Sequence, residues 1–123
     1  MSVHLHHAPL SARLLVAGGA IMAAAAVALS AYAAHVAQGV DQSRLHNAAL
    51  FAFGHGIALA ALAPRRPRML RTLALVVLLV GTLLFSGSLV LGVMVGMPTQ
   101  LAPVGGMLMI AAWLVYAVEA LRR

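Results

Sequence analysis

One histidine and three hydroxyl groups are the side chains best placed for chemistry, because they interrupt long apolar runs. His55 lies within residues 45–63, and Thr82, Ser86 and Ser88 lie within residues 72–97. At about 1.5 Å per helical residue, His55 and the first two hydroxyls fall at similar depths, roughly 15 to 21 Å from a membrane surface. A titratable group at that depth is costly and is a functional-site hypothesis by default. We therefore predict a candidate intramembrane polar site, with partners for His55 on the 72–97 helix.

This polar set has two interpretations. In the first, His55 relays protons or binds a ligand in the core of the protein. In the second, which we favour, it is a neutral imidazole that hydrogen-bonds to a hydroxyl or a backbone carbonyl and fixes the register of two helices.

Other histidines lie near the ends of the apolar runs. His35, Asp41 and His46 form a candidate outer-face site, but zinc usually takes three or four protein ligands, and Asp41 is the only acid available there. His4, His6 and His7 could form a metal-binding tract, although a solvated tail is the simpler interpretation. We expect no metal and no cofactor.

Catalytic patterns are missing from the sequence. There is no cysteine nucleophile, and Ser86 or Ser88 would need a base and an orienting acid, whereas Glu119 lies near the opposite surface. Paired carboxylates, phosphate-binding loops and nucleotide motifs do not occur. We expect that the protein is not an enzyme.

The composition indicates that the chain lies in a lipid bilayer rather than in water. Only 8% of its 123 residues are charged and 63% are hydrophobic, against roughly 25% charged in a soluble domain. A bilayer suits such a surface, and its backbone must then form helices or a closed barrel. The apolar runs are continuous rather than alternating, so we predict an all-α membrane protein.

Four runs are long enough to cross a bilayer, at about residues 13–37, 45–63, 72–97 and 101–121. Short connections force neighbouring helices to be antiparallel. We predict a single transmembrane domain over residues 1–123, an up-down-up-down bundle of four transmembrane helices. The start resembles a signal peptide with an Ala31-Tyr32-Ala33 cleavage site, but its apolar run exceeds the roughly 7 to 15 residues of such a peptide, so a retained helix is favoured.

Arginine sets the expected orientation. The net charge of +6 contains no lysine contribution, and seven of the eight arginines fall on one side of the predicted bundle, with Arg44 alone on the other. The central connection carries Arg65, Arg66, Arg68 and Arg71. The positive-inside tendency places both termini in the cytoplasm. The absence of lysine and the abundance of alanine are typical of a GC-rich bacterial genome, so we expect the chain in a bacterial inner membrane. These arginines should meet anionic lipid head groups rather than nucleic acid.

Small residues predict close helix packing. Gly19, Ala23, Ala26, Ser30 and Ala34 recur at helical spacing in the first run, as do Ala48, Ala52, Gly56 and Ala60 in the second. In the later runs the predicted packing glycines are Gly81, Gly87, Gly92, Gly105 and Gly106.

Four stretches carry a family resemblance: SAYAAHVAQG, FGHGIALAAL, GTLLFSGSLVLG and LAPVGGMLMIAAWLVYA. Together they resemble the YgdD-like family of small four-span membrane proteins of unknown function, which has a mitochondrial branch in eukaryotes. The LFSGSL segment at residues 84–89 is the most specific. Glycine replaces the aromatic that the family has before His55, and Val90 replaces the one after LFSGSL. The resemblance implies architecture and no activity.

Two functional hypotheses follow. We favour a structural or accessory membrane component that packs against itself, lipid or a larger complex. The alternative is a minimal transporter or channel component, in which His55, Thr82, Ser86 and Ser88 line a path.

Overall fold

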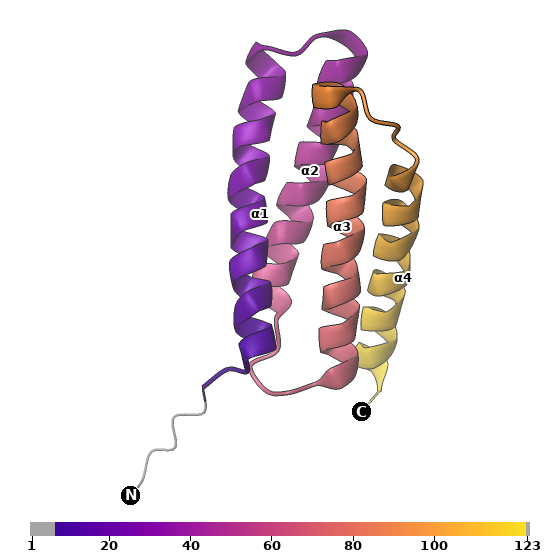
Figure 1. Cartoon of the computed structure of the whole chain (residues 1–123). Helices are drawn as coiled ribbons and strands as arrows, with labels where there is room; N and C mark the ends of the chain where they lie inside the picture. Colours follow the sequence, from indigo (N-terminus) through magenta and orange to yellow (C-terminus); the bar gives the residue numbers. More distant parts are fainter. Residues whose placement is uncertain (1–6, 123) are drawn as a thin grey trace, which may run out of the picture.

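The computed structural model describes residues 7–122 and contains four helices, with no strand in that range. They are α1 (Leu10–His35), α2 (Gly39–Leu62), α3 (Met69–Val95) and α4 (Leu101–Leu121). The helices run alternately up and down, so that the start of α1 and the end of α4 lie at the same end of the molecule (Figure 1). The predicted antiparallel four-helix architecture is confirmed.

Each helix is long and apolar enough to cross a membrane, by its length and composition. Large hydrophobic side chains cover the outside: Ile21, Leu83 and Ile110 are more than half exposed. So much exposed apolar surface is unfavourable in water, whereas the acyl chains of a bilayer solvate it. The four helices therefore form a multi-pass membrane protein.

The first connection is shorter than the sequence suggested. Residues 39–44, expected to lie in a loop, form the first turns of α2. Gly39 has a φ of 62°, a left-handed conformation that glycine adopts without steric cost, and this allows the chain to reverse within a few residues. The side-chain amide of Gln42 donates a hydrogen bond to the carbonyl oxygen of Ala33 at 3.1 Å, which ties the two helices together.

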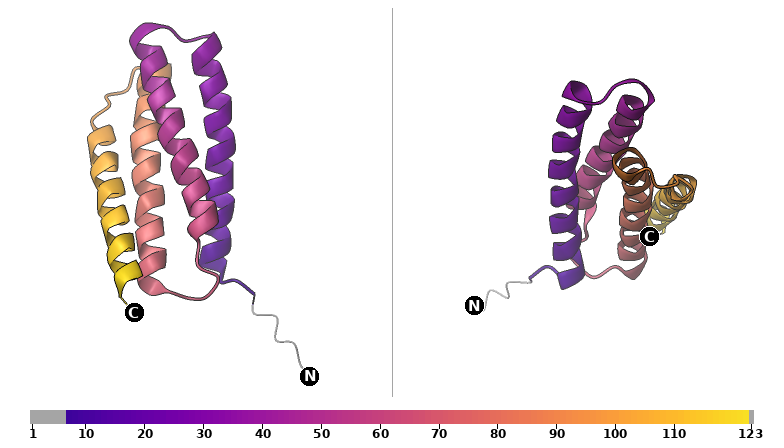
Figure 2. Two further views of the ribbon diagram at one scale, coloured as in Figure 1. Left: turned by 180° about the vertical axis from the view of Figure 1, so that it is seen from behind. Right: turned by 45° about the horizontal axis from the view of Figure 1, so that its top comes forward.

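The helices form two hairpins in an open arrangement. α1 packs along α2, α3 packs along α4, and α2 and α3 join the hairpins, while α1 also touches α3. Views from two sides place α1 and α4 at opposite edges (Figure 2). The backbones of α2 and α4 do not come into contact anywhere between residues 7 and 122.

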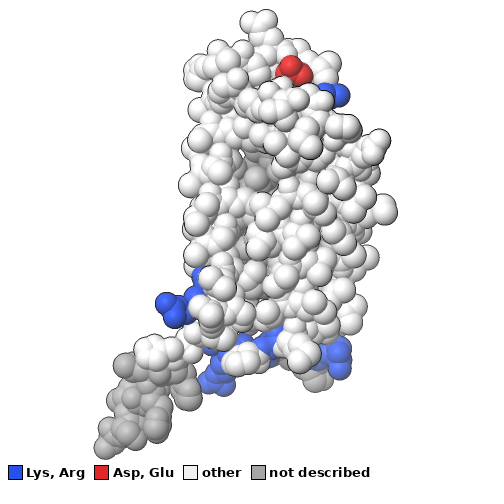
Figure 3. Space-filling model, in the orientation of Figure 1, with Lys and Arg blue, Asp and Glu red and all other residues white. Residues whose placement is uncertain are grey.

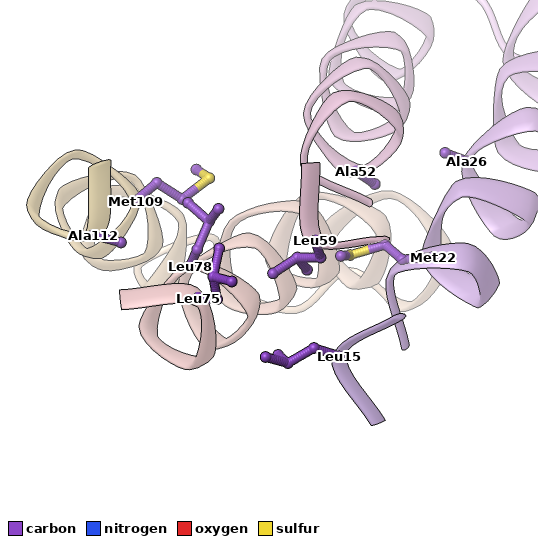
Figure 4. Packing of buried hydrophobic residues seen from close by; sticks show 9 residues of the cluster. All are labelled: Leu15, Met22, Ala26, Ala52, Leu59, Leu75, Leu78, Met109 and Ala112. Atoms are coloured by element: carbon purple, nitrogen blue, oxygen red, sulfur yellow. The ribbon is translucent and has the colours of Figure 1, made fainter. Parts of the chain in front are cut away.

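The core draws residues from all four helices. Its larger members are Leu15, Met22, Leu59, Leu75, Leu78 and Met109 (Figure 4). Alanines complete it at the closest approaches, at Ala26, Ala52 and Ala112. The core joins the two hairpins, because Leu59 of α2 and the leucines of α3 belong to the same cluster.

Glycines mark the point of closest approach within each hairpin. A Cβ atom added to Gly56 would lie 2.6 Å from the Gly19 carbonyl oxygen, and one added to Gly19 would lie 2.5 Å from the Gly56 carbonyl oxygen. In the second hairpin, a Cβ atom on Gly81 would lie 2.9 Å from the Gly105 carbonyl oxygen. Only hydrogen fits at these four positions, as expected where helix backbones meet in lipid.

The other predicted packing glycines differ among themselves. A Cβ atom on Gly92 would lie 2.7 Å from Thr99 Cγ2, so this glycine accommodates the loop between α3 and α4. Gly87 and Gly106 do not lie at a tight helix contact: Gly87 has open space around it, and Gly106 would only reach a Phe85 ring atom at 4.0 Å. Consecutive helix positions point about 100° apart, so a glycine beside a contact position can miss the contact altogether.

Candidate functional site

His55 bridges α2 and α4. Its Nδ1 lies 2.8 Å from the carbonyl oxygen of Phe51, one turn earlier in α2, and its Nε2 accepts a hydrogen bond from Trp113 Nε1 of α4 at 3.1 Å. A carbonyl can only accept and an indole N–H can only donate, so both bonds form together only when the proton is on Nδ1. The geometry therefore selects one neutral tautomer of the imidazole.

Aromatic rings surround this bridge. The Phe51 ring stacks on the imidazole with centroids 5.9 Å apart, and Phe85 of α3 packs against Phe51 at 4.8 Å. On the other side, Trp113 lies 5.9 Å from both His55 and Tyr116. His55 is thus half-buried within an aromatic cluster that joins α2, α3 and α4.

The predicted partners of His55 on α3 make other hydrogen bonds. Thr82 Oγ1 donates to the Leu78 carbonyl oxygen of its own helix at 2.7 Å, and Ser86 Oγ donates to the Ala48 carbonyl oxygen of α2 at 2.8 Å. Ser88 Oγ is buried without a hydrogen-bond partner in the described chain. The four residues of the candidate intramembrane site do not form one hydrogen-bonded group. Of the two kinds of partner expected for His55, the structure has the backbone carbonyl, and the second ring nitrogen bonds to Trp113 of α4 rather than to a hydroxyl of α3.

Trp113 is the residue that sequence reasoning missed. Its position predicts only that it lies in the later half of the fourth helix, although it is the only tryptophan of the chain. An indole N–H in an apolar setting needs an acceptor, and an imidazole nitrogen on a facing helix is one of the few side-chain acceptors available. That rule could have paired the two residues before the structure was known.

No group of three or more histidine, aspartate or glutamate side chains in residues 7–122 is arranged to hold a metal ion. His35, Asp41 and His46 are all exposed at or near the end of the bundle that holds the α1–α2 connection. Of the N-terminal histidine tract, His4 and His6 lie outside the described residues, and His7 is exposed.

The opposite end of the bundle carries most of the charge, and we call it the arginine end (Figure 3). Here Glu119, predicted only to mark the exit of the last helix, is buried and accepts hydrogen bonds from Arg68 at 2.8 Å and Arg71 at 3.0 Å. The Arg71 guanidinium also lies 5.2 Å from the centre of the Tyr116 ring. These contacts fasten the start of α3 to the end of α4.

Two of the concavities in the described chain border these elements with the clearest chemistry. The first, of about 650 Å³, lies between the halves of α1 and α2 that are nearest to their connection, and we call it the α1–α2 groove. Its walls include Ala31, Ala34, Leu50 and Phe53, and its polar residues are Ser30, His46 and Asn47. The second, of about 400 Å³, lies at the arginine end, and we call it the arginine pocket. It is lined by Arg65, Arg66, Arg68, Arg71, Tyr116 and residues 61–64.

Fold and charge distribution together define a small helical membrane protein with two antiparallel hairpins. The profile of a family described as "Protein of unknown function (DUF423)" matches residues 29–106, which run from the last turns of α1 into α4. The chain belongs to this uncharacterised family, in agreement with the resemblance noted in its sequence. Searches of curated proteins and of solved structures found no match.

Proposed function

We propose that the protein is a non-enzymatic accessory component of a bacterial inner membrane, and that its α1–α2 groove receives a transmembrane helix of a larger membrane complex. The groove is the observation that carries this proposal. It has a volume of about 650 Å³, and it opens on the outside of the bundle rather than into its core.

The chemistry of the groove suits a helix. Alanines on α1 allow another backbone to approach closely, while Leu50 and Phe53 of α2 offer apolar contact. Ser30, His46 and Asn47 add hydrogen-bonding groups, and such groups join helices across lipid at about 0.6 to 2 kcal/mol each. Small residues with a few polar ones are the usual basis of helix association in membranes.

The transporter alternative receives less support from the same geometry. A path would need His55, Thr82, Ser86 and Ser88 to face one shared space. Instead, the hydroxyls of Thr82 and Ser86 are bound to backbone carbonyls, and the imidazole is bound to Trp113. We therefore regard His55 and Ser86 as groups that join neighbouring helices, and Thr82 as bonded within α3, rather than as steps of a pathway.

The expected orientation follows the arginines. By the bounds of the helices, the arginine end holds all of the described arginines except Arg44: Arg13, Arg65, Arg66, Arg68, Arg71 and Arg122. By the positive-inside tendency, the arginine end faces the cytoplasm, and the α1–α2 groove then opens toward the outer leaflet.

Site-directed photo-crosslinking in native membranes tests the proposal. A photoreactive amino acid at Ala31 or Leu50 should form a discrete protein adduct, whereas one at Ile110 or Leu114 should not, although both are well exposed on α4. Filling the groove with Ala34→Leu should abolish the adduct from position 50, and Ala111→Leu on α4 should leave it intact. Equal adducts from all four positions, or adducts with phospholipid alone, would refute the helix-docking function.

A further inference from the structure

We propose that the arginine pocket is a binding site for an anionic phospholipid, whose phosphate is held by Arg65, Arg66, Arg68 and Arg71. The pocket is separate from the α1–α2 groove and stands at the opposite end of the bundle. Its volume of about 400 Å³ is lined by these arginines, by Tyr116 and by residues 61–64, where α2 ends and the connection to α3 begins.

Charge is the first argument. Four arginines line the pocket, and Glu119, whose carboxylate is shared between Arg68 and Arg71, is the only acidic residue near it in residues 7–122. Arg65 and Arg66 are exposed, and neither forms a salt bridge within residues 7–122. The pocket therefore carries a net positive charge of about three, and guanidinium forks match phosphate oxygens geometrically.

The start of α3 adds to the positive electrostatic potential near the pocket. Arg68 precedes the first residue of the 27-residue helix, the cap has no side-chain hydrogen bond, and the first turn contains no acid. The free N–H groups of a first helical turn and the positive end of the helix dipole both favour an anion. Arg68 and Arg71, which border this turn, also line the pocket.

A membrane lipid fits better than a soluble phosphate. The wall formed by Ala61, Leu62, Ala63 and Pro64 is apolar and ends a helix that crosses the bilayer. Basic pockets between transmembrane helices on the cytoplasmic side are a known way to hold anionic head groups. The glycerol and first acyl carbons of a phospholipid would meet this apolar wall while its phosphate meets the arginines.

The chain contains its own reporter for such a lipid. Trp113 is the only tryptophan, its ring lies 5.9 Å from that of Tyr116 in the pocket wall, and it is 37% exposed. Bromine atoms on the acyl chain of a bound lipid would quench its fluorescence. The assay uses two kinds of phosphatidylcholine nanodisc: one contains brominated phosphatidylglycerol, and the other an equal amount of brominated phosphatidylcholine. The ratio of the quenching in the two measures the preference of the protein for phosphatidylglycerol.

The full-length protein should be quenched preferentially by phosphatidylglycerol. Each arginine near a head group is worth about 1 kcal/mol, or roughly fivefold in affinity, so Arg65→Gln with Arg66→Gln should lower the preference roughly 25-fold. The matched control is Arg13→Gln with Arg122→Gln, which removes the same charge at the same end from exposed residues outside the pocket. This control should lower the preference by less than a factor of two. Circular dichroism establishes that both double variants keep the helical fold.

Two outcomes would overturn the proposal. If both double variants weaken the preference equally, or if the unaltered protein shows none, the arginines act only as diffuse surface charge. If millimolar glycerol phosphate abolishes the preferential quenching, the arginines recognise the phosphate group alone, and the proposed selection of a membrane lipid is wrong.

Discussion

Replacing Gly56 by alanine should separate the two helices of the first hairpin. The added Cβ atom would lie 2.6 Å from the Gly19 carbonyl oxygen and 2.9 Å from the Ala23 amide nitrogen, and ordinary contact begins at 3.4 Å. The nearest atom must therefore retreat by about 0.8 Å, from 2.6 to 3.4 Å. Both obstacles are backbone atoms of α1, so no side chain can rotate away and the helix has to move as a unit. We expect a loss of about 1–3 kcal/mol in the free energy of unfolding, the usual cost of overpacking.

Gly54→Ala is the matched control for this substitution. Gly54 lies two residues earlier in α2, and a Cβ atom added there would have no neighbouring atom within 4 Å. Both substitutions gain the same helix propensity, up to about 1 kcal/mol, so the difference between the two variants isolates the packing at the crossing. The control should be as stable as the unaltered protein or slightly more stable.

The assay is denaturant titration in mixed micelles, followed by far-ultraviolet circular dichroism and by the fluorescence of Trp113. The midpoint should fall for Gly56→Ala and stay or rise for Gly54→Ala. If the two variants unfold at the same midpoint, the helices do not meet at Gly19 and Gly56, and the packing described for the first hairpin is wrong.

Five further substitutions, grouped in three tests, probe the second hairpin and the polar contacts, with the same titration as the measurement. Gly105→Ala should lower the free energy of unfolding by about 1–3 kcal/mol, because its Cβ atom would lie 2.5 Å from a carbonyl oxygen of α3. The neighbouring Gly106→Ala should be neutral. Equal effects of the two substitutions would contradict the close contact between α3 and α4 at Gly105. Ser86→Ala should lower the free energy of unfolding by about 0.5–1.5 kcal/mol, because it removes the hydrogen bond to α2. Ser88→Ala should be neutral or stabilising, because the buried hydroxyl of Ser88 has no partner in the described chain. A larger loss for Ser88→Ala than for Ser86→Ala would be inconsistent with these assignments. Trp113→Phe keeps an aromatic ring but removes the bond to the imidazole, so it should cost about 0.5–1.5 kcal/mol, and an unchanged midpoint would show that the bridge adds no stability.

The architecture could be predicted because its cause is compositional. Long uncharged runs admit few structures in a bilayer, and arginine-rich or proline-containing segments separate them. The ends of the helices could be predicted less well. Glycine at position 39 suggests a helix stop, but its left-handed conformation instead opens α2, so polar residues such as Asp41 and Arg44 continue the helix.

The side-chain partners could be predicted only in part. Depth along a helix follows from residue number, and it predicts His55 and Ser86 to lie well inside the apolar runs. Depth does not give direction around the helix, and direction depends on how each hairpin packs. His55 therefore faces Trp113 of α4 rather than a hydroxyl of α3, and Ser86 reaches the backbone of Ala48.

Glu119 shows the same limit at the membrane surface. Its position near the end of the last run predicted only that it lies near a membrane surface, and not that it would be buried between Arg68 and Arg71. This pairing depends on α4 lying directly against α3, which is a property of the hairpin rather than of either segment alone.

Both proposals require four membrane crossings with the arginine end in the cytoplasm, and cysteine accessibility measures this directly. The chain has no native cysteine, so single cysteines at Gln100, in the α3–α4 connection, and at Pro67, in the arginine-rich connection, are unambiguous reporters. Both positions are exposed. A membrane-impermeant maleimide should label Gln100→Cys in intact spheroplasts and Pro67→Cys only after lysis. Labelling in the opposite order, or of both sites in intact spheroplasts, would contradict the account.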